Sequence, residues 1–93
     1  MSIARTAMQL DPRDNVATAL VDLSAGETVA VEGATVTLAV AIPRGHKFAL
    51  RPIAKDEAVT KYGQPIGRAT RAIQPGEHVH VHNVASQRAV RQS

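Results

Sequence analysis

The sequence contains no cysteine and no tryptophan among its 93 residues, and it has only one phenylalanine and one tyrosine. Without cysteine, the chain cannot form disulfides, zinc ribbons, iron–sulfur clusters or thiol nucleophiles. Phe48 and Tyr62 are too few aromatic side chains to form a platform for nucleic acid bases. We therefore expect no nucleic acid partner.

Long apolar segments are also missing. No run approaches the about 20 apolar residues that a membrane-spanning helix needs, and residues 1–5 lack the apolar core of a signal peptide. These features predict a cytoplasmic protein with no membrane partner. The length fits one domain, which buries only about 60–65% of its unfolded surface. So modest a core leaves little room for a private active-site cavity and favours a partner subunit or a homo-oligomer.

The net charge of +3 is unevenly distributed along the chain. Residues 1–43 carry a net −3, residues 44–71 a net +5 and residues 72–93 a net +1. The basic middle is suited to phosphates, carboxylates or an acidic protein surface, although scattered, solvated cations would give the same composition. The lysines and arginines do not fall on a helix that could enter a nucleic acid groove.

The apolar pattern predicts a mostly β fold with one or two short helices. We expect a helix between Asp14, a good N-cap, and Gly26, because the apolar residues between them recur at helical spacing. Short segments rich in Val, Ile and Thr predict strands at residues 27–31, 35–41, 47–50, 58–62, 66–68 and 77–84. Such short strands with close turns indicate a compact barrel or clip. We expect one domain over residues 1–84 and a basic, flexible tail over residues 85–93.

A turn motif occurs four times. Residues 23–29 and 73–79 share an apolar residue, two spacers, glycine, glutamate and a return to apolar residues. Residues 53–59 repeat this form with Asp56 at the glycine position, and residues 42–48 are a looser copy. The spacings of 19, 11 and 20 residues are too irregular for a solenoid. They suit a small β fold that uses one turn type several times.

The four histidines occur at two places, His46 and the alternating series His78, His80 and His82. A strand would direct all three members of the series to one face. It would also separate His78 from His82 by about 13 Å, whereas metal–imidazole bonds are only about 2.1 Å long. We therefore expect one ion to take the neighbouring pair His80 and His82, and we interpret His78 as a surface histidine.

Other chemistry is open to these imidazoles, since histidine also acts as a general acid or base near neutral pH. A site of His, Asn and Asp oxygen without thiolate suits Fe²⁺, Mn²⁺ or Zn²⁺ better than Cu⁺. His-x-His alone is a weak motif. The longer series that ends at Asn83, directly after Pro75-Gly76-Glu77, is more specific.

Taken in order along the chain, these motifs closely resemble the N-terminal module of altronate and galactarate dehydratases. The resemblance covers residues 9–84, nearly the whole chain. The segments that carry it are Asp14-Asn15-Val16-Ala17, Arg44-Gly45-His46-Lys47-Phe48-Ala49-Leu50, Ile53-Ala54-Lys55, residues 59–67 and residues 75–83. It implies a SAF-type β-clip fold and a role in the β-elimination of water from sugar acids, usually with Fe²⁺ or a similar divalent cation.

The resemblance also implies a partner. Some members are split into two polypeptides, and sulfolactate sulfo-lyase is a related split enzyme that expels sulfite. Because this chain stops soon after Asn83, where full-length relatives continue, it resembles the small subunit of a hydro-lyase that needs a separate large subunit and is inactive alone. The alternatives are the small subunit of a sulfolactate sulfo-lyase and a non-catalytic module that binds an anionic sugar or a protein.

Site residues follow from the resemblance and from the chemistry of elimination, which needs a base for the α-proton and an acid or metal for the leaving hydroxide. We expect His46, His80 and His82 to hold a divalent metal, and His46, Lys47 and Lys61 to be catalytic. The substrate-binding candidates are Arg44, Tyr62 and Asn83. Both lysines would equally suit exposed strand edges, and Tyr62 a half-buried position in the core.

Overall fold

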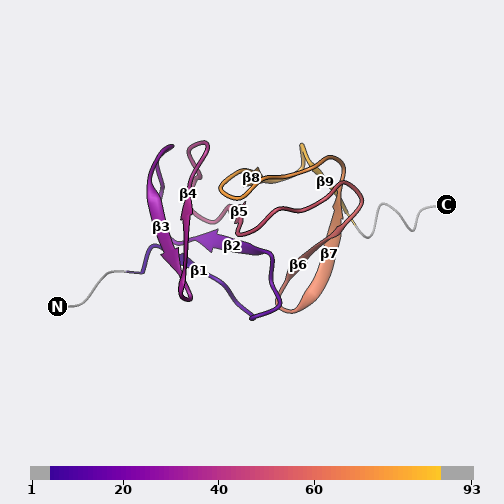
Figure 1. Cartoon of the computed structure of the whole chain (residues 1–93), viewed down its shortest axis with the longest axis horizontal. Helices are drawn as coiled ribbons and strands as arrows, with labels where there is room; N and C mark the ends of the chain where they lie inside the picture. Colours follow the sequence, from indigo (N-terminus) through magenta and orange to yellow (C-terminus); the bar gives the residue numbers. More distant parts are fainter. Residues whose placement is uncertain (1–4, 87–93) are drawn as a thin grey trace.

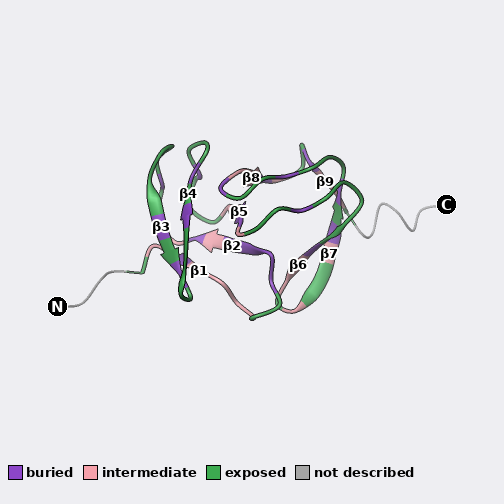
Figure 2. Ribbon diagram, in the orientation of Figure 1, coloured by how far each residue is buried: buried purple, intermediate pink, exposed green. Residues whose placement is uncertain are grey.

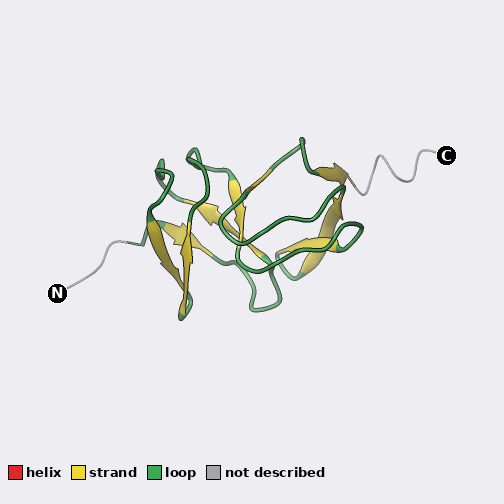
Figure 3. Cartoon of the chain, turned by 45° about the horizontal axis from the view of Figure 1, so that its top comes forward, coloured by secondary structure: helices red, strands yellow, loops and turns green. Residues whose placement is uncertain are grey.

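The computed structural model describes residues 5–86, and these residues form strands and turns without a helix (Figure 3). The mostly β fold that the sequence predicts is confirmed. The described residues include no helix with the length and apolar character needed to span a membrane.

Within residues 5–86, nine short strands form three antiparallel sheets. The largest has the order β1-β2-β5-β8 and comprises Ala7–Met8, Val16–Ala19, Lys47–Ala49 and His78–Val79. The hairpin of β3 and β4 comprises Thr28–Val31 and Ala34–Thr37. The third sheet has the order β6-β7-β9 and comprises Ala58–Lys61, Gln64–Ala69 and Val84–Ser86. The β3–β4 and β6–β7 hairpins lie at opposite ends of the molecule, with β2, β5 and β8 between them (Figure 1).

The four turn motifs are arranged as two equivalent pairs. Leu23 bridges Ile42, and Ile53 bridges Ile73, each through two reciprocal backbone hydrogen bonds of 2.8–2.9 Å. The first pair brackets the β3–β4 hairpin, and the second brackets the β6–β7 hairpin. The chain is therefore built from two similar halves, offset by 30 positions at Leu23 and Ile53. The predicted reuse of one turn type is confirmed.

Each half has its own hydrophobic core, and the buried segments of both meet near the middle of the molecule (Figure 2). The first core contains Leu23, Leu38, Ile42 and Phe48, and the second contains Ile53, Val59, Ile73 and Val79. Burial of these apolar side chains is the main favourable contribution to folding in each half, at about 25 cal/mol per Å² of apolar surface.

The predicted helix between Asp14 and Gly26 is wrong, because Val16–Ala19 is strand β2. Ala17 and Ala19 belong to the first core, whereas Val16 belongs to the second. A strand that is buried on both faces carries apolar residues without a clean alternation, and such a short run is easily read as a helix.

Asp14 is not a helix cap but the cap of the turn between β6 and β7. It is fully buried, and its carboxylate accepts the backbone N–H groups of Asp11, Tyr62 and Gly63 at 2.8–3.1 Å. Tyr62 and Gly63 both have positive φ, at 60° and 71°, so their N–H groups turn toward one acceptor. The neighbouring Asn15 bonds to β6 through both ends of its carboxamide. The N-terminal segment is therefore fastened to the second half by polar contacts.

The predicted strands correspond to β3–β8 within a few residues, with one exception. Residues 77–84 are not one strand: His78–Val79 form β8, the chain then turns, and Val84 begins β9. Strand β9 reaches Ser86, inside the segment that the sequence assigned to a flexible tail, and residues 87–93 lie outside the described residues.

We predict that Asp14→Ala lowers the free energy of unfolding by about 2–4 kcal/mol, since it leaves three partly buried backbone N–H groups without their acceptor. Urea unfolding followed by circular dichroism measures the change. Asp22→Ala is the matched control, because Asp22 is exposed and accepts one backbone N–H, from Arg44 at 2.8 Å. It should cost no more than about 1 kcal/mol. Equal effects of the two substitutions would contradict the assignment of Asp14 as a structural cap.

Candidate functional site

The turn at residues 43–46 differs from the other three in a way that releases its last side chain. In those three turns, the carboxylates of Glu27, Glu57 and Glu77 accept the first backbone N–H of their own turn at 2.8–3.3 Å. Pro43 offers no N–H at that position, and His46 stands in place of the glutamate. The backbone turn itself persists, because the His46 N–H donates to the Pro43 carbonyl at 3.0 Å. The His46 imidazole is therefore not held by its own turn.

Strand pairing brings the other histidines to His46. Strand β5 begins directly after His46 and pairs with β8, which begins with His78. His46 Nδ1 lies 2.9 Å from His78 Nε2. The rings of His46, His78 and His80 stack on one another with centroids 4.6–5.2 Å apart. One nitrogen from each of these three residues lies within 4.8 Å of the other two, which makes them a candidate three-nitrogen metal site.

Asn83 shapes the loop that carries the last two histidines. It is fully buried, its Oδ1 accepts the His80 N–H at 3.0 Å and its Nδ2 donates to the His78 carbonyl at 2.8 Å. Asn83 therefore holds this loop, and its contact with a substrate stays a prediction. Because the loop turns, the rings of His78 and His82 lie 5.4 Å apart, and not at the about 13 Å of a straight strand.

The structure groups His46 and His80 with His78, whereas the sequence predicted His82 as the third ligand. His78 was interpreted as a surface histidine, but it is half-buried and contacts both other rings. His82 is exposed and stacks at a tilt against His78. The signal that would have found His78 is Asn83 itself, because asparagine favours turns and indicates that the strand ends before it.

The surroundings of His78 and His80 favour the neutral form of these two imidazoles. Burial is the main cause that lowers the pKa of His78, followed by the neighbouring His46, His80, His82 and Lys47. Loss of hydration and the charges of His46, Lys47 and His82 lower the pKa of His80 in the same direction. A neutral imidazole is the form that binds a metal ion, so a lowered pKa keeps both side chains available as ligands at neutral pH.

Lys47 and Lys61 were both predicted as catalytic. Lys47 places positive charge beside His78 and His80, and Lys61 lies near enough to Lys47 for its charge to act on it. Lys47 lies opposite Val79 in the β5–β8 pair. Burial, and then the charge of Lys61, lower the pKa of Lys47. Neither lysine forms an ion pair within residues 5–86. Lysines that have no carboxylate partner are suited to binding an anionic ligand.

Arg44 and Tyr62 lie outside the histidine cluster. Arg44 is exposed in its turn, where its backbone N–H donates to Asp22. Tyr62 is 63% exposed, more than the half-buried core position considered for it, and its ring centroid is 5.1 Å from Lys61 Nζ. Their contact with a substrate stays a prediction.

Two hollows flank the cluster. The first has a volume of about 220 Å³ and is lined by Lys47, Ile66, His80, Val81, Val84 and Ser86. The second, of about 140 Å³, is lined by Ala39, Val40, Arg71, Glu77, His78 and His82. A larger hollow of about 460 Å³ lies beside Asp11 and Glu32, and neither histidine nor lysine lines it. The cluster with its two hollows is therefore the candidate site, although it is not the largest concavity.

Known proteins are similar in sequence to nearly all of this chain. The family described as the altronate/galactarate dehydratase SAF domain matches residues 5–87. The chain is 57% identical over 70 residues to altronate dehydratase of Escherichia coli, and 40% identical over 79 residues to altronate dehydratase of Bacillus subtilis. These matches cover 75% and 85% of this chain but only 14% and 16% of the relatives.

A second kind of relative is shorter. The chain is 58% identical over 48 residues to (2R)-sulfolactate sulfo-lyase subunit alpha of Chromohalobacter salexigens, a match that covers 52% of this chain and 51% of the relative. The chain thus spans a small part of the dehydratases and about half of this subunit.

We predict that His78→Ala weakens the binding of Zn²⁺ at least about 100-fold, because loss of even an outer-shell partner of a metal site costs about 10–100-fold. His82→Ala should weaken binding less than about threefold, since His82 lies outside the three-nitrogen group. Isothermal titration calorimetry measures both affinities, and circular dichroism checks that each variant is folded. The opposite order of effects would restore the ligand set that the sequence predicted.

Proposed function

The chain belongs to the altronate/galactarate dehydratase SAF domain family, and we propose that it is the small subunit of a metal-dependent sugar-acid hydro-lyase. It works with a separate, larger catalytic chain to eliminate water from a hydroxy acid. The observation that carries the proposal is the three-nitrogen cluster beside Lys47, which, like the nearby Lys61, has no ion-pair partner among residues 5–86. The relatives support a role within a larger enzyme, since the matched region is a minor part of two altronate dehydratases or belongs to a subunit named alpha.

The cluster suits a divalent cation. Bonds of about 2.0–2.1 Å to one ion place tetrahedral ligands roughly 3.3 Å apart, so small ring rotations bring the nitrogens of His46, His78 and His80 from their present separations to an ion. Imidazole ligands without thiolate are compatible with Fe²⁺, Mn²⁺ or Zn²⁺. When bound, the cation supplies a Lewis acid for the hydroxyl group that is lost.

The lysines bind the acid and move its proton. Lys61 holds the substrate carboxylate by charge and hydrogen bonds. Because burial lowers the pKa of Lys47, its amine is unprotonated more often than that of an exposed lysine, and an unprotonated amine can take the α-proton. The electron pair of the broken C–H bond forms the new C=C bond as the C–O bond breaks. The hydroxide takes up a proton from solvent and leaves as water, and the Lys47 ammonium returns the α-proton to solvent.

The second candidate function is the small subunit of a sulfolactate sulfo-lyase. It is favoured by the 58% identity to the Chromohalobacter subunit. The chemistry of the chain's own residues would be the same up to the leaving group, because a carboxylate must be bound and an α-proton removed in both eliminations.

We predict that the tagged chain, isolated with its large partner from native cells, eliminates water from altronate or galactarate. Chelation with EDTA should abolish the activity, and Fe²⁺ should restore it. Lys47→Ala should lower kcat by about 10²–10⁴-fold, the usual contribution of a general base. Lys55→Ala is the matched control, because Lys55 is exposed in the turn at residues 54–57 and should leave kcat unchanged.

The results distinguish the hydro-lyase subunit from the sulfo-lyase subunit and from a non-catalytic binding module. Elimination of sulfite from sulfolactate without activity on the sugar acids would select the second candidate. An active complex that is insensitive to EDTA, or to Lys47→Ala, would contradict the proposed site. A complex without lyase activity on any of the three acids would leave a non-catalytic binding module.

A further inference from the structure

Val81, which lies between two histidines in the sequence, is an apolar side chain that the fold leaves in solvent. It is 82% exposed, more than any other large hydrophobic residue within residues 5–86. Its loop is closed by Asn83, whose backbone N–H donates to the His80 carbonyl at 3.1 Å. The Asn83 side chain also holds the His80 N–H and the His78 carbonyl. The exposed position of Val81 is therefore built into the loop.

Val81 belongs to an apolar rim that runs along both hollows beside the cluster. The first hollow is lined by Val81 together with Ile66 and Val84. The second is lined by His82, the next residue along the chain, and by Val40, which is 44% exposed. Single exposed apolar residues are common on protein surfaces, whereas apolar side chains gathered along a binding site mark a contact surface. We call these four residues, Val40, Ile66, Val81 and Val84, the apolar rim.

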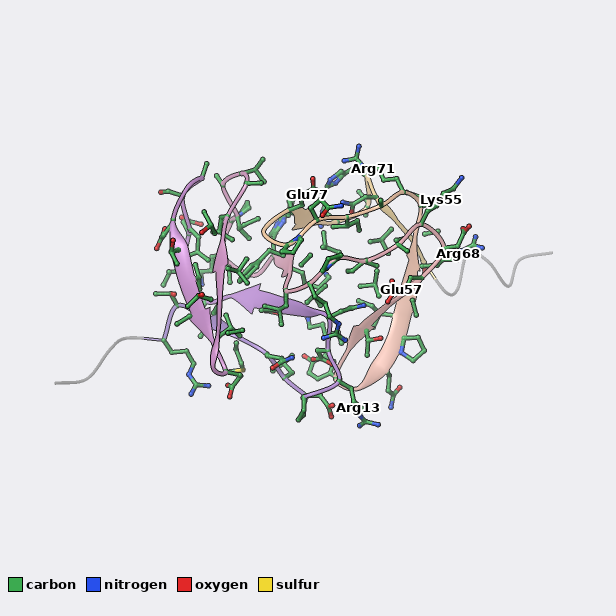
Figure 4. The ribbon with its side chains drawn as sticks, viewed as in Figure 1. Arg13, Lys55, Glu57, Arg68, Arg71 and Glu77 are labelled. Carbon is green, nitrogen blue, oxygen red and sulfur yellow. The ribbon has the colours of Figure 1, made fainter. Side chains whose placement is uncertain are left out.

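Arg71 adds a positive charge beside this rim. It is exposed, it lines the second hollow, and it forms no ion pair within residues 5–86. Glu77 lines the same hollow, but its carboxylate accepts the Gln74 N–H at 3.3 Å and forms no ion pair with Arg71. Figure 4 shows Arg71 and Glu77 on the upper side of the molecule and Arg13 on the lower side. Arginine is enriched at protein interfaces and binds carboxylates through two parallel hydrogen bonds, so this guanidinium is suited to a carboxylate on another protein.

The fold fixes the position of Val40 relative to the second half of the chain before any partner binds. The segment after β4 crosses the turn at residues 74–77, where a Cβ atom at Gly76 would overlap the carbonyl oxygen of Thr37. Gly76 also has a φ of 87°, so glycine is required at this crossing. The Ala39 N–H donates to the Gly76 carbonyl at 3.0 Å. A surface that is already in place loses little conformational entropy on binding.

The proposed function supplies the protein that would cover this surface, because it gives the chain a larger catalytic partner. In the two altronate dehydratases, most of the polypeptide lies outside the region that matches this chain. A stable interface buries roughly 800 Å² on each partner, which is more than the few side chains of the apolar rim provide. A stable contact therefore extends from the rim across both hollows.

We propose that the apolar rim and Arg71 form the surface on which the large catalytic chain docks, with apolar side chains against the rim and a carboxylate against Arg71. The inference rests on the proposed function and adds the face through which the two chains meet. The docked chain covers both hollows, so the histidine cluster becomes one wall of a site enclosed between two polypeptides.

The test uses the tagged chain and the large chain from the complex isolated from native cells, with the large chain identified by the lyase activity that it gives the complex. Analytical ultracentrifugation measures the Kd of the two purified chains. Val81→Asp should raise Kd at least about 10-fold, because it places a carboxylate against apolar side chains. Arg71→Ala should also raise Kd at least about 10-fold, because the carboxylate of the partner loses its opposite charge.

Ala34→Asp and Arg13→Ala are the matched controls. Ala34 is exposed at the start of β4, Arg13 is exposed on the lower side in Figure 4, and neither lines either hollow beside the cluster. Both substitutions should leave Kd within about threefold of the wild-type value. Circular dichroism checks that all four variants are folded.

An active complex whose Kd is unchanged by Val81→Asp and Arg71→Ala would overturn the docking surface and leave the proposed function in place. Controls that weaken the complex as much as these two variants would do the same. A wild-type chain that dimerises alone, and whose dimer Val81→Asp dissociates, would assign the rim to a second copy of this chain instead. If no large chain that confers lyase activity is isolated, the proposed function and the docking surface are overturned together.

Discussion

The pairing of β5 with both β2 and β8 is the contact on which the rest of this structure depends. It joins the two halves of the chain, because β2 precedes the first hairpin and β8 follows the second. It also determines the chemistry, since His46 stands at the start of β5 and His78 pairs with Phe48 across the β5–β8 ladder. Backbone hydrogen bonds therefore bring together two histidines that are 32 positions apart in sequence.

The candidate site arises where one copy of a repeated turn departs from the others. In three copies, the glutamate carboxylate accepts the first backbone N–H of its own turn, so that side chain is already hydrogen-bonded within the turn. In the remaining copy, Pro43 removes the donor and His46 removes the acceptor, while the backbone bond of the turn is retained. The replacement of the glutamate by His46 keeps the backbone hydrogen bond of the turn and leaves one imidazole available for binding. The same reuse of turns places segments of both halves around the second hollow.

Much of this arrangement can be predicted from local patterns, and the failures have a common cause. The strands and the turn repeat follow from short-range residue preferences. The strand at Val16–Ala19 did not, because its two faces belong to two different cores. His78 was missed because alternation along the sequence predicts a straight strand, whereas buried Asn83 turns the chain back on itself. In both cases the conformation depends on contacts that alternation along the sequence does not reveal: packing against two cores for β2, and the side-chain hydrogen bonds of Asn83 for the loop.

The most direct test of the account is a crystal structure of the chain loaded with Zn²⁺, with the ion located by its anomalous scattering. The account predicts one ion about 2.0–2.1 Å from a nitrogen of each of His46, His78 and His80. An ion bound by His82 without His78, or no ion at the cluster at a saturating concentration of the metal, would contradict it.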